Sequence, residues 1–250
     1  MPFAICHLTF AICHLLFTIY PLPCYNFVMK QSSLFDIISP IMVGPSSSHT
    51  AGAVKLGLLS RNIYGNTPKK ITFKLYNSYA LTGRGHGTDK GLLAGVLGFP
   101  VDDIRIKTIF ELPEAKEIDY NFEFLEDFNR HPNAVDFIFE GAQRMTISGN
   151  SVGAGNVEIV NINNFAVNLS GEYNSLVLIY KDKRGILSKV SGIIQNEGVN
   201  IASLTCERMA KGEEASMCMC LDSALNYSIV EKIKRIDDVY LVRHVGKLES

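Results

Sequence analysis

Cysteine is missing from the whole middle of this chain of 250 residues. The six cysteines lie near the two ends, at positions 6, 13, 24, 206, 218 and 220. This distribution excludes the disulfide framework of a small secreted domain. Free thiols are typical of a reducing compartment, so we expect a cytoplasmic protein. The length allows one large domain or two small ones, each with its own core.

Clustered basic side chains are also missing, and the formal net charge is −1. A protein whose main partner is nucleic acid needs Lys and Arg gathered on one face to bind phosphates. We therefore expect no nucleic-acid partner. A small neutral or zwitterionic ligand fits this charge balance better.

Charged residues are absent from residues 1–28, where the segment Phe3–Leu8 is repeated at Phe10–Leu15. The stretch lacks the basic start and small-residue cleavage site of a signal peptide. A membrane anchor is an alternative, although histidines and threonines dilute the apolar run before Pro21. The Cys-His pairs do not match a compact zinc spacing. We interpret residues 1–28 as a leader outside the fold, with Met29 as the working start and no membrane partner.

Residues 30–171 alternate between helical and strand periodicity. Helical spacing predicts helices over 51–65 and 89–100, and apolar alternation predicts a strand over 69–80. Three further strands are expected between residue 135 and Gly171. The pattern predicts an α+β unit.

Residues 172–250 follow the order strand, helix, strand, strand, helix, strand. This βαββαβ order is the ferredoxin-like arrangement, a four-stranded antiparallel sheet with both helices on one face. The first strand, which starts near Tyr173, is apolar at successive positions, so we expect both of its faces to be buried.

The loop "GPSSSHT" (44–50) carries more hydroxyl groups than one helix cap needs. A helix N-terminus with spare hydroxyl donors suits a carboxylate, and a histidine exchanges protons near pH 7. An elaborate cap beside a surface histidine is the structural alternative. The candidate residues are Ser46, Ser47, Ser48, His49 and Thr50.

A second polar loop, "LTGRGHGTDKG" (81–91), leads into the next predicted helix. Its glycines allow the backbone to approach a ligand closely. Arg84 is suited to binding a carboxylate, His86 to moving a proton, and Thr88 to capping the helix or binding the ligand. A flexible glycine loop with solvated charges is the alternative. Two such loops favour a convergent pocket for a small anion.

The segment "GNSVG" (149–153) matches the nucleophile elbow of hydrolases. An elbow needs a helix after the serine, whereas an alternating strand pattern follows Ser151. We therefore expect a hairpin or loop here rather than a hydrolase site.

Five segments together resemble the beta chain of the bacterial iron–sulfur-dependent L-serine dehydratases, over about residues 33–246. They are "GPSSSHTAGA", "TGRGHGTDKGLLAG", "HPNAVDF", "SVGAGNVEI" and "LSGEYNSLVLIYKDKRGILSKV". The resemblance implies a serine-dehydratase beta domain over 30–171 followed by an amino-acid-sensing ACT domain over 172–250. It also implies the lyase reaction that converts L-serine to pyruvate and ammonia, with a 4Fe–4S cluster as Lewis acid. Since residues 30–205 contain no cysteine, the cluster ligands are expected on a separate alpha chain.

The expected roles follow from this resemblance and from the two loops. Ser46, Ser47, Ser48, His49, Thr50, Arg84 and Thr88 are the candidate substrate-binding residues, and His49, His86 and Ser47 are the candidate catalytic residues. The ACT unit is expected to form a homodimer and to bind serine near Gly185, Asn200 and Ile201. No metal ligand is assigned to this chain. The alternative is a non-catalytic, amino-acid-sensing regulatory subunit.

Four positions depart from the pattern expected of this family. Asn77 stands where we expect glycine, Arg84 where lysine is common, and Ala154 interrupts a run of glycines. Lys183-Arg184-Gly185 lacks the proline that usually precedes the glycine of an ACT loop.

Overall fold

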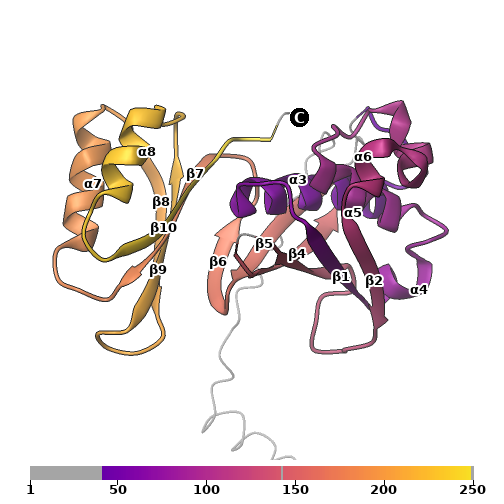
Figure 1. Cartoon of the computed structure of the whole chain (residues 1–250), viewed down its shortest axis with the longest axis horizontal. Coiled ribbons are helices and arrows are strands. Elements are labelled where there is room, and N and C mark those ends of the chain that lie inside the picture. Colours follow the sequence, from indigo (N-terminus) through magenta and orange to yellow (C-terminus); the bar gives the residue numbers. More distant parts are fainter. Residues whose placement is uncertain (1–40, 142, 249–250) are drawn as a thin grey trace, which may run out of the picture. The chain divides into compact units, whose positions relative to one another are not determined.

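The computed structural model describes residues 41–141 and 143–248, which form two β-sheets with associated helices (Figure 1). In these ranges no helix combines the length and apolarity needed to cross a membrane. The leader over 1–28 and the proposed start at Met29 lie outside the described residues. The α+β class is confirmed.

The six-stranded sheet has the order β2-β1-β3-β4-β5-β6. Strands β1 and β2 run parallel, and every other neighbouring pair is antiparallel. A parallel pair needs a long crossover connection. The connection from β1 to β2 contains four helical segments and the second polar loop. The strands are β1 (Lys70–Tyr76), β2 (Asp119–Leu125), β3 (Ala134–Glu140), β4 (Met145–Gly153), β5 (Asn156–Ile162) and β6 (Phe165–Leu169).

Helices and turns of this part lie between β1 and β2 or before β1. They are η1 (Ser47–Ala51), α3 (Gly52–Tyr64), α4 (Ser78–Thr82), α5 (Thr88–Leu97), η2 (Ile104–Glu111) and α6 (Pro113–Lys116). Helix α3 packs on β4 and β5, and α5 packs beside α3 (Figure 1). Ile71, Phe73 and Leu75 alternate along β1 and are fully buried in this core, as the alternating pattern predicts.

Glycines let α3 and α5 approach each other closely. A Cβ atom on Gly57 would lie 2.8 Å from the Cα of Gly95, and one on Gly95 would lie 2.1 Å from the carbonyl oxygen of Val54. Any larger residue at either position would push the helices apart. The close contact brings the loops that precede the two helices together, which creates the site described below.

The chain bends at positions that sequence periodicity did not reveal. The strand expected over 69–80 ends at Tyr76, because Asn77 adopts φ 51° and ψ −115° and the chain then turns into α4. The last expected strand is two strands, since Asn163 and Asn164 both have positive φ and form a two-residue hairpin turn. Strand β2 was not expected. The end of the first predicted helix is confirmed, because α3 has its C-cap at Gly65, which adopts a φ of 83°.

The four-stranded sheet has the order β10-β7-β9-β8 and is antiparallel throughout. Its elements are β7 (Asn174–Lys181), α7 (Ile186–Asn196), β8 (Ile201–Arg208), β9 (Glu214–Leu221), α8 (Tyr227–Lys234) and β10 (Val239–Val245). The predicted βαββαβ order is therefore confirmed. Residues 175–180 of the central strand β7 are all buried, so both faces are covered as expected.

Candidate active site

The hydroxyl-rich loop forms a π-helical turn, η1, that continues directly into α3. Ser46 is its N-cap, and its Oγ accepts a hydrogen bond from the backbone N–H of His49 at 3.1 Å. The carbonyl of Ser47 accepts the N–H of Gly52, five residues on. Such wide turns are rare and occur often at functional sites.

Two buried hydroxyls hold this turn through the carbonyl of Ser48. The Tyr79 hydroxyl donates to it at 2.9 Å and the Ser151 hydroxyl at 2.8 Å. Ser151 is fully buried in β4 and is followed by the β4–β5 hairpin, as predicted. Its hydroxyl therefore supports the turn and has the wrong setting for a hydrolase nucleophile.

The ring of His49 lies among three hydroxyl groups. Its Nδ1 is 3.3 Å from Ser48 Oγ, and its Nε2 is 3.3 Å from Ser78 Oγ and 3.1 Å from Thr82 Oγ1. The Thr82 hydroxyl already donates to the carbonyl of Ser78 at 2.9 Å, so its oxygen is left to accept from His49. Acceptance by the Thr82 oxygen favours the tautomer with the ring proton on Nε2, in which the lone pair of Nδ1 can accept a proton.

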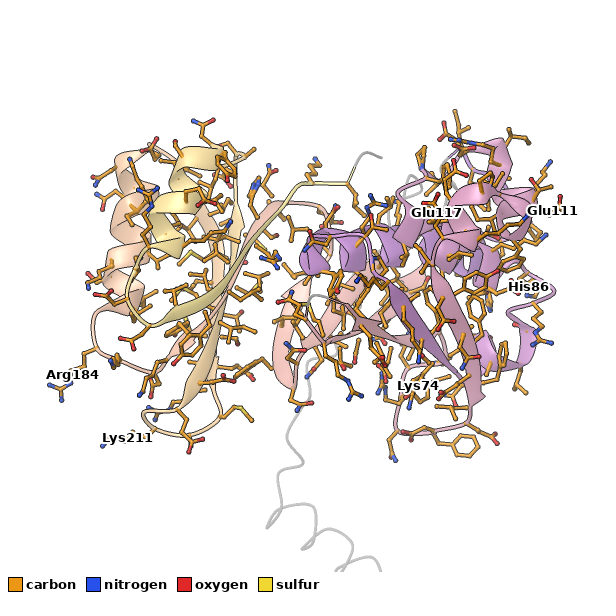
Figure 2. All side chains as sticks on the ribbon, in the orientation of Figure 1. Lys74, His86, Glu111, Glu117, Arg184 and Lys211 are labelled. Atoms are coloured by element: carbon orange, nitrogen blue, oxygen red, sulfur yellow. The ribbon has the colours of Figure 1, made fainter. Side chains whose placement is uncertain are left out.

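His86 lies on the same side of the molecule as α4 and α5 (Figures 1 and 2). The centroid of its ring is 5.0 Å from that of His49. Burial, and next the neighbouring His86, lower the pKa of His49 below its ordinary value, while a hydrogen bond to Ser78 opposes the shift. His49 is therefore neutral near pH 7, as a general base must be.

The two polar loops converge. The Thr50 hydroxyl donates to the His86 carbonyl at 2.7 Å, and both loops line a cavity of about 240 Å³. The charged residues of its lining are all cations: Arg84, Lys90 and Lys107. A cavity with this lining suits a small anion such as a carboxylate.

The structure brings Ser46, Ser48, His49, Thr50, Arg84 and His86 to this cavity or to the adjoining histidine cluster. Thr88 is an exception. Its side chain is 0% exposed, and its hydroxyl has no hydrogen-bond partner within the described ranges. Direct contact between Thr88 and a substrate is therefore not supported by its position.

Three residues that contact the candidate site were missed from the sequence: Ser78, Tyr79 and Thr82, all on α4. Ser78 and Thr82 are four residues apart, which places their hydroxyls on one helix face. That spacing is visible in the sequence, but residues 77–80 were included in the expected strand. A turn recognised at Asn77 would have indicated a helix after it.

The ACT-type candidates are separated within one chain. The register aligns Asn174 with Leu221 and Leu221 with Ile201 at one end of the sheet. Gly185 follows β7 at the other end, where Arg184 and Lys211 extend from the sheet (Figure 2). One copy of the chain therefore does not bring Gly185 and Asn200-Ile201 together, because β7 and β8 run in the same direction.

Two parts of the chain match known protein families. Residues 176–241 match the AHAS small subunit-like ACT domain, and residues 33–119 match the serine dehydratase beta chain. The chain is 34% identical over 219 residues to the probable L-serine dehydratase beta chain of Bacillus subtilis, which covers 87% of this chain and 100% of that protein. It is 38% identical over 221 residues to the L-serine dehydratase beta chain of Peptoniphilus asaccharolyticus, with 87% and 99% covered. The chain belongs to the L-serine dehydratase beta-chain family.

Proposed function

We propose that this chain is the beta subunit of an L-serine dehydratase, a lyase that converts L-serine to pyruvate and ammonia. The observation that carries the proposal is His49, a neutral histidine whose Nδ1 lies 3.3 Å from the Ser48 hydroxyl and which directly precedes Thr50 of the cationic cavity. The names of the relatives with nearly complete coverage support the same reaction.

The chemistry divides between binding and proton transfer. The elimination removes the proton from Cα and the hydroxyl group from Cβ, and the resulting enamine becomes an imine that water hydrolyses to pyruvate and ammonia. The cationic cavity, with the hydroxyls of the first loop, binds the substrate carboxylate. His49 Nδ1 accepts the Cα proton. Ser48 Oγ lies 3.3 Å from that nitrogen.

The cysteines in the described part do not fit an iron–sulfur site. Residues 41–141 and 143–248 contain no group of three or more His, Cys, Asp and Glu side chains placed to hold a metal. Cys218 is only 4% exposed, and burial raises the pKa of its thiol to about 12, against the thiolate form that a cluster needs. We place the 4Fe–4S cluster on an alpha subunit, which completes the active site.

A relative supports a divided active site. L-serine dehydratase 2 of Escherichia coli is 35% identical over 105 residues, a match that spans 40% of this chain and only 20% of that protein. Most of that protein thus has no counterpart in the match, as expected if an alpha chain supplies the remainder here. The free thiols Cys206, Cys218 and Cys220 support a cytoplasmic location for the complex.

The pH dependence identifies which histidine accepts the proton. Because the folded-state pKa of His49 is lowered, the base stays active as pH falls and the acid limb of kcat/KM lies below pH 6.5. His86→Gln removes the neighbouring charge, so the pKa of His49 rises toward its ordinary value and the acid limb moves to higher pH. Profiles of kcat/KM for the assembled enzyme measure this. Near-complete loss of activity in His86→Gln, without a shifted limb, would assign the proton transfer to His86 instead.

A homodimer through the ACT sheet would bring Gly185 of one copy near Asn200 and Ile201 of the other. Strand β8 is one of the two edge strands of the four-stranded sheet, and its residues after Ile201 are exposed. Antiparallel pairing of two β8 edges places the Asn200 end of one copy at the same end as Gly185 of the other. The serine site of the ACT unit is then formed by two copies.

Ser203→Pro tests this dimer, because proline removes a main-chain donor and is poorly tolerated in a paired strand. Circular dichroism checks that the variant keeps its own sheet, since Ser203 is also paired with Cys220 of β9. We expect the variant to lose dimerisation in analytical ultracentrifugation and serine binding in isothermal titration together. Lys211→Ala, in the β8–β9 turn, is the control and should retain both. Serine binding by a monomeric variant would contradict the two-copy site.

A further inference from the structure

Asn77 combines an unusual backbone conformation with an unusual set of side-chain contacts. Its φ of 51° and ψ of −115° match the first central position of a type II′ turn, which glycine normally occupies. Glycine is the residue expected here in the family, so turning the chain requires no side chain, and any support given by the amide is particular to this chain. The asparagine must therefore offset its strained backbone through what its amide binds.

The amide of Asn77 binds the loop of residues 126–133, which connects β2 to β3. Its Oδ1 accepts the N–H of Asp127 at 2.9 Å, and its Nδ2 donates to the carbonyls of Asp127 at 2.8 Å and Arg130 at 3.2 Å. The backbone N–H of Asn77 donates to the carbonyl of Leu125 at 3.1 Å. One side chain thus joins two segments about fifty residues apart in the sequence.

The 126–133 loop is itself fixed to the sheet. Arg130 forms an ion pair with Asp136 of β3 at 2.5 Å, and the Tyr76 hydroxyl donates to the same carboxylate at 2.8 Å. The guanidinium carbon of Arg130 lies 4.5 Å from the centroid of the Tyr76 ring. Because Asp136 is only 9% exposed, the carboxylate of this ion pair is shielded from solvent. Asn77 therefore binds a loop that is held in place by Asp136 and Tyr76.

What Asn77 holds on its other side is α4. Its carbonyl accepts the N–H of Leu81 at 2.9 Å, and the N–H of Tyr79 donates to Pro132 of the same loop at 3.3 Å. Ser78 follows Asn77 directly, and the hydroxyls of Ser78 and Thr82 are the two groups that contact His49 Nε2. A rotation of α4 would remove both contacts at once.

We propose that Asn77 is a positioning residue for His49: it ties α4 to the 126–133 loop, and thereby keeps the ring proton of His49 on Nε2 and the lone pair of Nδ1 toward the substrate. The role in turnover rests on the proposed dehydratase function. The effect on the histidine ring is independent of that function.

Asn77→Gly is the informative variant, because glycine tolerates the backbone conformation and removes only the amide. Asn163→Gly is a matched control. Asn163 also has a positive φ, of 49°, and its Oδ1 also accepts a backbone N–H, that of Thr146 at 2.9 Å. It lies in the β5–β6 turn, so a general effect of losing such an amide appears in both variants.

Nitrogen-15 NMR of the histidine rings in the full chain gives the first measurement. We expect one His49 tautomer, with the proton on Nε2, in the wild type and in Asn163→Gly, and a mixture of both tautomers in Asn77→Gly. In the assembled enzyme, Asn77→Gly should lower kcat at least about tenfold with KM changed less than about threefold. An unchanged tautomer and kcat in Asn77→Gly would overturn the proposal.

The two measurements separate the two hypotheses. If the wild-type complex makes no pyruvate while the tautomer of His49 still responds to Asn77→Gly, the positioning role holds and the proposed function fails. If the complex is active and Asn77→Gly behaves as Asn163→Gly does, the function holds and the positioning role fails.

Discussion

Replacing His49 by alanine should lower the turnover of the assembled enzyme at least about a hundredfold, because a positioned general base contributes a factor of about 10²–10⁴. The fold should survive the change. The N-cap bond to Ser46 Oγ comes from the backbone N–H of residue 49, which alanine retains. We therefore expect the free energy of unfolding to change by only about 1 kcal/mol.

Turnover is measured as pyruvate formed by the complex, and stability by thermal unfolding of the same preparation. His244→Ala is the matched control, because His244 is also half-buried and burial likewise lowers its pKa. It lies on β10 of the four-stranded sheet, outside the proposed site. Near-normal turnover in His49→Ala would favour the alternative that this chain is a regulatory subunit without a catalytic base.

The residues at the two polar loops were predictable because their chemistry is local. A helix start with surplus hydroxyls and a glycine-rich loop with a histidine are visible as short sequence patterns. The close packing of α3 on α5 then brings the loops together, and the glycines at 57 and 95 that allow it are also visible in the sequence. What could not be predicted is that these glycines face each other.

The support of the site was not predictable, because it comes from far along the chain. Ser151 reaches the carbonyl of Ser48 across 103 residues, and its motif suggested a different enzyme class. Ser78 and Thr82 were missed because apolar alternation predicts a strand that continues past Tyr76. The backbone at Asn77 decides that boundary, and asparagine gives a weaker turn signal than the glycine expected there.

The glycine run expected at residues 153–155 has the same explanation. Ala154 has a φ of 52°, between Gly153 at 105° and Gly155 at 78°. All three positions favour glycine on conformational grounds, so the family pattern reflects the shape of the β4–β5 turn. The departure at Ala154 costs some strain and removes no side chain from the candidate site.

The four-stranded sheet shows where element order stops being informative. The βαββαβ order fixed which elements exist, and the alternation along β7 indicated that both its faces are buried. Strand direction then placed Gly185 and Ile201 at opposite ends. A ligand site inferred from two short segments needed the register, which periodicity does not supply.

The chain purified alone should contain no iron–sulfur cluster and should form no pyruvate, and both should appear when it is joined to an alpha chain. The reason is ligand supply. Among the described residues Cys206 is exposed, Cys218 is buried and Cys220 lies between these extremes, and none lies in the six-stranded sheet that bears His49. Cys218 and Cys220 do share one face of β9, but two thiols are too few for a cluster.

Iron analysis and a pyruvate assay after anaerobic purification measure this outcome. Two variants locate the cluster ligands: a chain that starts at Met29, without Cys6, Cys13 and Cys24, and the double variant Cys206→Ser with Cys220→Ser. In complex with the alpha chain, both should keep the iron content and turnover of the wild type. The truncated chain should also fold and assemble normally, because the repeated apolar run of residues 1–28 has no partner segment in the periodic pattern of the sequence. A brown, active single chain would contradict the two-subunit enzyme, and loss of iron in either variant would place cluster ligands on this chain.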